Sequence, residues 1–143
     1  MIAVYTASKL AQYGRWRKLK EELLPHGIDL HARWYRQVEL GVEETPSNAE
    51  VFWQQDVEDV KNSHAVLVFG EGDEQLRGAY VEAGVAIGAG IPVIVVGDFN
   101  YGTWVHVPGV VHVGSIEDAV RYLKGNRRLL EEKRRATLWR DAA

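Results

Sequence analysis

No cysteine occurs among the 143 residues of the chain, and this absence removes several kinds of chemistry at once. A chain without thiols forms no disulfide bond, has no cysteine nucleophile and offers no thiolate ligand to zinc. The absence fits a reducing compartment, so we expect a cytoplasmic protein. The five histidines also lack a metal-ligand spacing such as H-x-x-x-H. We therefore predict no metal site, and nothing in the sequence indicates a cofactor.

The chain also lacks long apolar runs and an excess of positive charge. Its longest apolar runs are only strand-sized, which excludes a membrane-spanning helix. The first residues, from Met1 to Thr6, have the pattern of a strand and no basic leader, so we expect no signal peptide. The net charge is −3, which gives no reason to expect nucleic acid as the main partner. A hydrophobic share of 46% predicts one soluble domain with a sizeable core.

Strand-sized apolar segments alternate with helical patterns along the chain. The predicted strands cover residues 2–6, 28–34, 64–69, 91–96 and 110–113. The predicted helices cover residues 10–24, 49–62, 78–89 and 115–124. This alternation predicts an α/β fold, a flavodoxin-like or Rossmann-like three-layer sandwich with a five-stranded parallel sheet. We expect one domain over residues 1–124 and a charged helical tail over residues 125–143.

Two details of this assignment depend on short motifs. Ser47-Asn-Ala-Glu50 has the pattern of a capping box, so the second predicted helix should begin near Ala49. The polar stretch at residues 36–47 contains Gly41 and Pro46, which indicates a mobile loop.

The rest of the chain is organised around the glycine-rich stretch from Arg77 to Gly97, in which a loop leads into a helix and then into a buried strand. Ligands of parallel α/β sheets lie at the carboxyl ends of the strands, where residues 7–9, 70–77 and 98–108 form the candidate loops. Glu82 is expected in the first turn of this helix, where free N–H groups and the helix dipole favour its ionised form. The position suits a nucleophile, and it also suits, more commonly, a residue that only caps the helix.

Asp56 is the second informative acid. It lies four residues from an apolar position on either side, so it falls on or beside the apolar stripe of its helix. Glu58 and Asp59 lie further round and are expected in solvent. An acid placed like Asp56 either bonds a loop backbone or takes part in catalysis. Together, Glu82 and Asp56 would supply the paired carboxylates of glycosyl transfer, in which one attacks the sugar carbon and the other orients or protonates the leaving group.

Residues at the ends of the first two predicted strands are candidates for substrate binding. Tyr5 and Ser8 lie at the end of the first strand. Ser8 could bond a phosphate or a sugar hydroxyl, and it could also simply close a turn. Trp34 and Tyr35 end the second strand, and they could stack on a base or only pack in the core.

The loop that opens the glycine-rich helix matches no common nucleotide motif. It lacks the G-x-x-x-x-G-K-[ST] pattern of a P-loop, and a dinucleotide fingerprint should follow the first strand, so an NAD-dependent dehydrogenase is not expected. Arg77, just before Gly78, could hold an anion or balance Glu82, and it could equally remain solvated. The basic residues of the first predicted helix most often form a solvated face, and one of them could contact a phosphate.

Three segments together resemble the nucleoside 2-deoxyribosyltransferase-like family. They are Val4-Tyr-Thr-Ala-Ser8, Gln55-Asp56 ahead of Asn62-Ser-His-Ala-Val-Leu-Val-Phe69, and Gly78-Ala-Tyr-Val-Glu82-Ala-Gly84-Val-Ala86 leading into Gly90-Ile-Pro-Val93. The third segment is the most specific, because a small-residue loop, Glu-x-Gly-x-Ala and a Gly-x-Pro-Val strand entry follow one another at the spacing of the family. The resemblance covers about residues 2–124.

This resemblance implies a flavodoxin-like fold and cleavage of the N-glycosidic bond of a nucleoside or nucleotide. Glu82 matches the nucleophile that attacks the anomeric carbon, and Asp56 matches the acid that assists near the base. Water then completes a hydrolase reaction, or a second base completes a transferase reaction. Members are usually homo-oligomers in which a neighbour often finishes the pocket. Apolar residues of the charged tail could serve such contacts: Leu129, Leu130, Leu138 and Trp139.

Two departures from the family pattern bear on the substrate. Transferases of the family carry an acid just before the glycine of the loop, and Leu76 and Arg77 stand in that place here. An arginine beside the site suggests an anionic substrate such as a 5′-monophosphate. The loop also lacks the serine through which monophosphate hydrolases of the family bind phosphate. Phosphate recognition would then depend on Ser8, Arg77 or a basic residue of the first helix.

Three alternatives remain open. A phosphoribohydrolase of the cytokinin-activating type also uses a glycine-rich loop followed by Glu, but its Pro-Gly-Gly-x-Gly-Thr motif does not match Gln75-Leu-Arg-Gly78. An NAD-cleaving domain with a similar sheet would release nicotinamide from NAD. A binding module that senses a nucleotide would bind its ligand and release no base, and the missing acid before Gly78 favours that reading.

Overall fold

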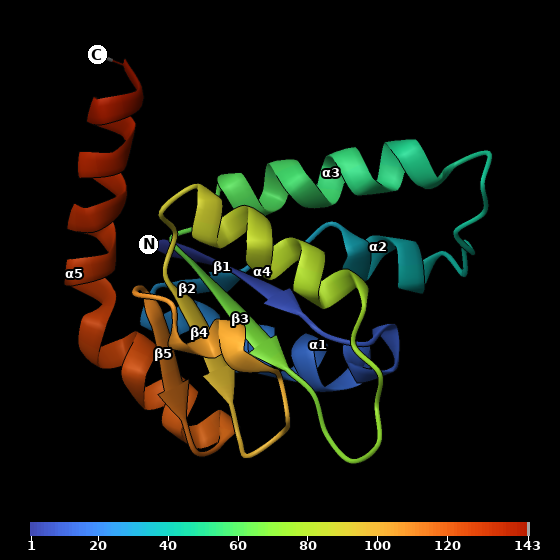
Figure 1. The fold of residues 1–143 in the computed structure, drawn as a ribbon, viewed down its shortest axis with the longest axis horizontal. Coiled ribbons are helices and arrows are strands. Elements are labelled where there is room, and N and C mark those ends of the chain that lie inside the picture. Colours follow the sequence, from blue (N-terminus) through green and yellow to red (C-terminus); the bar gives the residue numbers. More distant parts are fainter. Residues whose placement is uncertain (143) are drawn as a thin grey trace.

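The computed structural model describes residues 1–142, and it describes side chains through Leu138. Five parallel strands form one sheet in the order β2-β1-β3-β4-β5 (Figure 1). This is the strand order of flavodoxin-like proteins, so the α/β fold expected from the sequence is confirmed. The strands are β1 (Ile2–Ala7), β2 (Ile28–Leu30), β3 (Ala65–Phe69), β4 (Val93–Val96) and β5 (Val110–Val113).

Helices cover both faces of the sheet. They are α1 (Tyr13–Leu23), α2 (Trp34–Glu39), α3 (Ala49–Lys61), α4 (Gly78–Gly88) and α5 (Ile116–Ala142), with short 3₁₀ helices at Leu10–Gln12, Leu24–His26 and Thr103–His106. The helices α3 and α4 pack side by side over one face, while α1 and the first part of α5 share the other (Figure 1). No helix in the described part of the chain is both long enough and apolar enough to cross a membrane.

The centre of the sheet forms the core. Every residue of β3 and β4 is buried, which explains why both strands read as continuous apolar runs. The register pairs Val4 of β1 with Ala65 of β3, and Val66 of β3 with Val93 of β4. The carboxyl ends of β1, β3 and β4 therefore meet at one edge of the sheet.

The second predicted strand is shorter than expected, and part of the loop predicted after it is helical. β2 ends at Leu30, and the chain then turns into α2, which begins at Trp34 and runs through part of the stretch expected to be a mobile loop. Long-range hydrogen bonds explain the difference, because the Trp34 indole N–H donates to the carbonyl of Thr6 over 3.0 Å and the Tyr35 hydroxyl bonds the Thr6 side chain. Contacts of this kind leave no periodic signal in the sequence.

One helix cap and one helix end differ from the expected ones. α3 begins at Ala49, as expected, but the predicted capping box does not form. Ser47 bonds Thr45, while Asn48 accepts a bond from the Thr45 N–H and makes no side-chain cap bond. The last helix continues well past residue 124, where its end was expected, and reaches Ala142. Its second half passes the start of the sheet, where Glu131 lies 3.2 Å from the amino group of Met1 (Figure 1).

The apolar residues expected to serve contacts in the tail have different environments. Leu130 is buried, whereas Leu129 and Leu138 are 56% and 50% exposed. The Trp139 side chain lies outside the described residues.

Candidate active site

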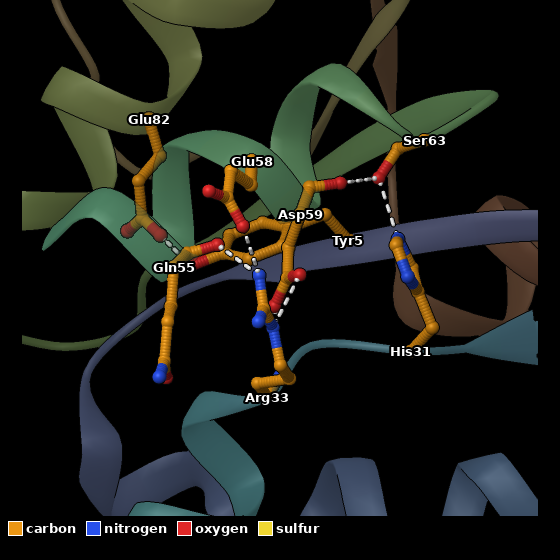
Figure 2. Close-up of polar contacts among 8 residues, drawn as sticks. All are labelled: Tyr5, His31, Arg33, Gln55, Glu58, Asp59, Ser63 and Glu82. Carbon is orange, nitrogen blue, oxygen red and sulfur yellow. Dashed lines mark hydrogen bonds and ion pairs between the residues drawn. The ribbon is translucent and has the colours of Figure 1, made fainter. Parts of the chain in front are cut away.

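Glu82 and Tyr5 meet at the centre of the candidate site, although they come from different layers of the fold. Tyr5 is a buried residue of β1, and its hydroxyl donates a hydrogen bond to Oε2 of Glu82 in α4 (Figure 2). Glu82 is only 7% exposed. This burial raises the pKa of the Glu82 carboxyl to about 8, because surroundings with few polar groups disfavour the charged form.

The setting of Glu82 differs from the expected one in two respects. Because α4 begins at Gly78, Glu82 lies in the second turn, beyond the free N–H groups of the helix start. Its carboxyl is held by a tyrosine instead, and its pKa is raised rather than lowered. This position excludes the helix-capping role that the sequence left open.

Asp56 of α3 is the second acid of the site. Its side chain is partly buried and makes no hydrogen bond or ion pair with any side chain in the described structure. Burial raises the pKa of its carboxyl to about 7, with further contributions from the negative charges of Asp59 and Glu44, while Arg33 acts in the opposite direction. The structure thus contains two carboxyl groups whose pKa values lie near neutral pH, a property often found in catalytic acids and bases.

Both acids line one cavity of about 220 Å³. The cavity lies at the carboxyl end of β1, and α2, α3 and α4 form its walls. Since β1 connects to β2 on one side and pairs with β3 on the other, this end is the topological switch point, where ligands of doubly wound sheets bind. Seven of the candidate residues line this cavity: Tyr5, Ser8, Trp34, Asp56, Arg77, Gly78 and Glu82. Tyr35, the other candidate for stacking on a base, is instead buried against β1, where its hydroxyl bonds the Thr6 side chain.

Two tryptophans, Trp34 and Trp53, line the cavity, and together we call them the aromatic wall. The Trp34 ring is fixed by the bond from its indole N–H to the Thr6 carbonyl, so only its ring surface remains to face a ligand. Trp53 of α3 lies against Gly78 at the start of α4. A Cβ atom at position 78 would come within 3.1 Å of Cη2 of Trp53, which is tighter than ordinary contact. Glycine at this position therefore allows the indole to approach the helix that carries Glu82.

Arg33 and Asp59 join the start of α2, which carries Trp34, to α3. The backbone N–H of Arg33 donates to Asp59 Oδ2 and its Nε donates to Asp59 Oδ1, each over 2.8 Å (Figure 2). Asp59 is only 5% exposed, so the expectation that it lies in solvent was wrong. Its partner is 26 residues away in the sequence, and no local pattern indicates such a pairing.

Ser8 and Arg77 both line the cavity, but only the Ser8 side chain already has hydrogen-bond partners in the described structure. The Ser8 hydroxyl donates to the carbonyl of Lys9 over 3.0 Å and accepts from the indole of Trp16 over 2.8 Å. It would have to give up the first bond to donate to a phosphate. Arg77 is exposed, and no hydrogen bond or ion pair engages its side chain in the described structure. Arg77 is thus the better placed of the two to receive an anion.

The basic residues of α1 are mostly engaged elsewhere. Arg17 pairs with Glu21 and Lys20 pairs with Asp29. Arg15 lies 3.5 Å from Glu71 and packs over the Phe69 ring. These pairs account for the basic pattern of the helix without a phosphate.

A larger hollow of about 770 Å³ lies beside this cavity, over the ends of β3, β4 and β5. Its charged lining residues include Glu71, Asp98 and Glu117, and all three are exposed. Most of the aromatic loop at residues 98–108 does not line a cavity, because Trp104 packs on Tyr80 of α4 and Tyr101 packs on Trp104. Since the larger hollow has no buried titratable group, we place the candidate site in the smaller one.

Several residues of the cavity were not expected from the sequence. Trp53 is three residues before Asp56, so it shares that face of α3, and this spacing could have identified it. Gln37 and Glu44 come from the stretch taken for a mobile loop, and Lys9 belongs to the turn after β1. In the described part of the chain, no group of three or more His, Cys, Asp or Glu side chains is placed to hold a metal ion.

Comparisons with known proteins establish a relationship of fold. No family model matches the chain, and no curated protein matches it. Among solved structures, the CMP N-glycosidase BcmB of Clostridium botulinum is similar over 85% of this chain and 96% of that chain. The TM-score is 0.57 and the sequence identity is 18%. An identity this low shows the shared fold alone.

Proposed function

We propose that this protein cleaves the N-glycosidic bond of a nucleoside or nucleoside 5′-monophosphate. The observation that carries the proposal is the pair Glu82 and Asp56 in one cavity, each with a pKa raised towards or above neutral pH. Paired carboxylates of this kind catalyse glycosyl transfer. The aromatic wall of Trp34 and Trp53 suits a base, because flat rings stack on its faces.

In the first step Glu82 acts as the nucleophile. One carboxylate oxygen attacks C1′ of the sugar, the N-glycosidic bond breaks, and its electron pair moves to the base nitrogen. Asp56, in its protonated form, donates a proton to the leaving base. The hydrogen bond from Tyr5 to Oε2 stabilises the ionised form of Glu82 and leaves Oε1 available for attack.

The second step releases the sugar from Glu82. Water attacks C1′, the ester bond breaks, and the electron pair returns to the Glu82 carboxylate. The proton of the water passes to Asp56, which restores the starting state. In a transferase a second base would attack in place of water. The absence of an acid before Gly78 favours the hydrolase over base exchange.

Two basic side chains at the cavity support an anionic substrate. Arg77 is unpaired among the described side chains, and Lys9 lies in the same lining. One or both would bind a 5′-phosphate, while Glu82 and Asp56 act at the sugar and the base. The structural neighbour acts on CMP, and this activity makes a pyrimidine monophosphate the first substrate to test.

The test is base release measured by chromatography. The protein would be incubated with nucleosides, nucleoside 5′-monophosphates and NAD, with and without an acceptor base, beside Glu82→Gln and a Glu22→Gln control on the exposed end of α1. Free base that disappears in Glu82→Gln and persists in the control supports an N-glycosidase. A newly formed nucleoside identifies a transferase, and nicotinamide released from NAD identifies an NAD glycohydrolase.

A binding module is the second candidate, and the missing acid before Gly78 is the observation that favours it. Such a module would bind a nucleotide in the same cavity without cleaving it. Absence of base release from every substrate, together with saturable binding measured by calorimetry, would decide for this candidate.

We also propose that the protein forms a homo-oligomer through α4. The only charged residue of this helix is the buried Glu82. Its outer surface carries Val81, which is 53% exposed, together with the exposed Gly84 and Gly88. A helix that is apolar on its outer face gains free energy when another surface covers it.

A further inference from the structure

Arg33 binds a single turn of α3 through four donated hydrogen bonds. Besides its two bonds to Asp59, its Nη2 donates to Glu58 Oε2 over 2.9 Å and to the carbonyl of Gln55 over 3.3 Å (Figure 2). Asp56 lies within this turn, directly after Gln55. The contacts from Arg33 therefore hold the turn that presents Asp56 to the cavity.

The next two residues, Trp34 and Tyr35, bind β1. The Trp34 indole donates to the backbone of Thr6 and the Tyr35 hydroxyl bonds the Thr6 side chain. Thr6 follows Tyr5, which contacts Glu82. Three consecutive residues thus connect the strand that positions Glu82 with the helix turn that carries Asp56.

A second contact supports the same turn from its other end. Ser63 donates to the carbonyl of Asp59 over 2.7 Å, so it accepts a bond from Nε2 of His31, also over 2.7 Å (Figure 2). His31 must carry its proton on Nε2 to donate it. Burial lowers the pKa of His31, which agrees with a neutral ring in this role.

We propose that Arg33 is a positioning residue of the site, which holds Asp56 in the cavity lined by Trp34 and Trp53 although its own side chain lies outside that cavity. The inference rests on the proposed function, because Asp56 is assigned its role there. Arg33 has 47% of its side chain exposed, so it is reached by solvent and does not fill the core. A surface arginine with four donated bonds to one helix turn is expected to act through the geometry of that turn.

The charge of Arg33 has a second effect on Asp56. The negative charges of Asp59 and Glu44 disfavour ionisation of Asp56, and the positive charge of Arg33 favours it. Other charged groups line the cavity around Asp56: Lys9 after β1, Arg77 before α4 and Glu82 within α4. Removal of Arg33 leaves Asp59 uncompensated beside Asp56, so Asp56 should release its proton at higher pH.

The experiment compares Arg33→Met, Arg33→Lys and the matched control Arg36→Met, an exposed arginine of α2. Two readouts are needed: kcat and KM for the best substrate of the panel, and the titration midpoint of Asp56 by NMR with ¹³C-labelled aspartate. The Asp56 signal is assigned by its loss in Asp56→Asn. Melting temperatures of all variants report on folding.

We expect Arg33→Met to lower kcat by about 10- to 100-fold with little change in KM, since small displacements of catalytic groups have effects of this size. The Asp56 midpoint should rise in this variant. Arg33→Lys keeps the charge but not the planar fork, so kcat should fall while the midpoint stays near that of the wild type. Arg36→Met should change neither quantity.

The outcomes separate this inference from the proposed function. Unchanged kcat and an unchanged Asp56 midpoint in Arg33→Met would overturn the inference, and so would a lower melting temperature as the only effect. If the wild type cleaves no substrate, the proposed function fails, and the Asp56 midpoint alone decides whether Arg33 controls this carboxyl. If Arg33→Met does not fold, the fall in kcat expected for a folded Arg33→Lys decides the test.

Discussion

The hydroxyl of Tyr5 donates a hydrogen bond to the carboxyl of Glu82, and this contact joins the central sheet to the helix above it. Both residues are buried, so the bond lies in surroundings where a carboxylate has few other partners. The structure therefore combines two opposing effects on Glu82: burial favours the neutral acid, and the tyrosine hydroxyl favours the anion.

The first prediction concerns the pH dependence of kcat/KM. The proposed mechanism needs ionised Glu82 and protonated Asp56, so the rate should rise as Glu82 loses its proton and fall as Asp56 loses its own. With pKa values of about 8 and about 7, a bell-shaped profile with its maximum between pH 7 and 8 follows.

Two variants test the assignment of the limbs. Tyr5→Phe removes a donor to the Glu82 carboxylate, so the pKa of Glu82 should rise and the maximum should move to higher pH. Asp56→Asn should remove the alkaline limb. A profile that keeps its alkaline limb in Asp56→Asn would contradict the assigned role of this residue.

The second prediction concerns stability against pH. The pKa of Glu82 is about 8 in the folded protein, against 4.5 for an ordinary glutamate, because burial penalises the charged form. The folded state therefore binds the Glu82 proton more tightly than the unfolded state does, and protonation of Glu82 favours folding. This contribution is complete below pH 4.5 and is lost as the pH rises through about 8. The wild type should therefore lose stability relative to Glu82→Gln as the pH rises, by an amount on the order of 5 kcal/mol above pH 8.

Urea unfolding at pH 5 and pH 9 measures most of this difference, because Glu82 of the folded protein is protonated at the first pH and ionised at the second. Glu22→Gln, at an exposed position of α1, is the control and should follow the wild type at both values. Parallel stability curves for the wild type and Glu82→Gln would show that Glu82 does not titrate as a buried group.

The third prediction concerns Gly78. An added methyl group would lie 3.1 Å from Trp53 and 4.0 Å from Oε1 of Glu82, so Gly78→Ala should displace the indole and weaken substrate binding. We expect kcat/KM to fall by about tenfold or more, in line with the effect of small displacements at a site. Gly14→Ala in α1 is the matched control, because no atom lies within 4 Å of its added Cβ.

Gly14→Ala should leave kcat/KM unchanged and raise stability by up to about 1 kcal/mol, as expected for this exchange within a helix. Equal activity of both variants would mean that Trp53 adjusts freely and that close packing at Gly78 has no part in binding.

The fourth prediction concerns assembly. If α4 forms the interface, Val81→Asp places a charge in it and should shift the protein to the monomer, measured by light scattering coupled to gel filtration. Leu24→Asp, which changes an exposed leucine after α1 on the other face of the sheet, should leave the assembly unchanged. A monomeric wild type at high concentration would contradict the proposed oligomer.

The sequence predicts the sheet well because the evidence for each central strand is local. The strands β3 and β4 are continuous apolar runs, and the segment from Gly78 to Gly90 has glycines at both ends of a helix. The same segment contains Glu82, so the sequence also identified a residue of the cavity. Local patterns are sufficient where neighbouring residues in the chain determine the conformation.

The missed features depend on contacts between distant parts of the chain. The helix start at Trp34 is held by Thr6, and the burial of Asp59 depends on Arg33. Neither pairing has a spacing that a helix or strand pattern would indicate. The pKa of Glu82 was likewise misjudged, because the sequence shows the helix but not the depth of burial.

The two tryptophans of the cavity give the protein an internal optical reporter. Trp34 and Trp53 line the cavity, whereas Trp16 is fully buried with its indole bonded to Ser8. A base stacked on the first two should quench their fluorescence. Ligand binding can thus be followed without a label, even in a variant that has lost its nucleophile.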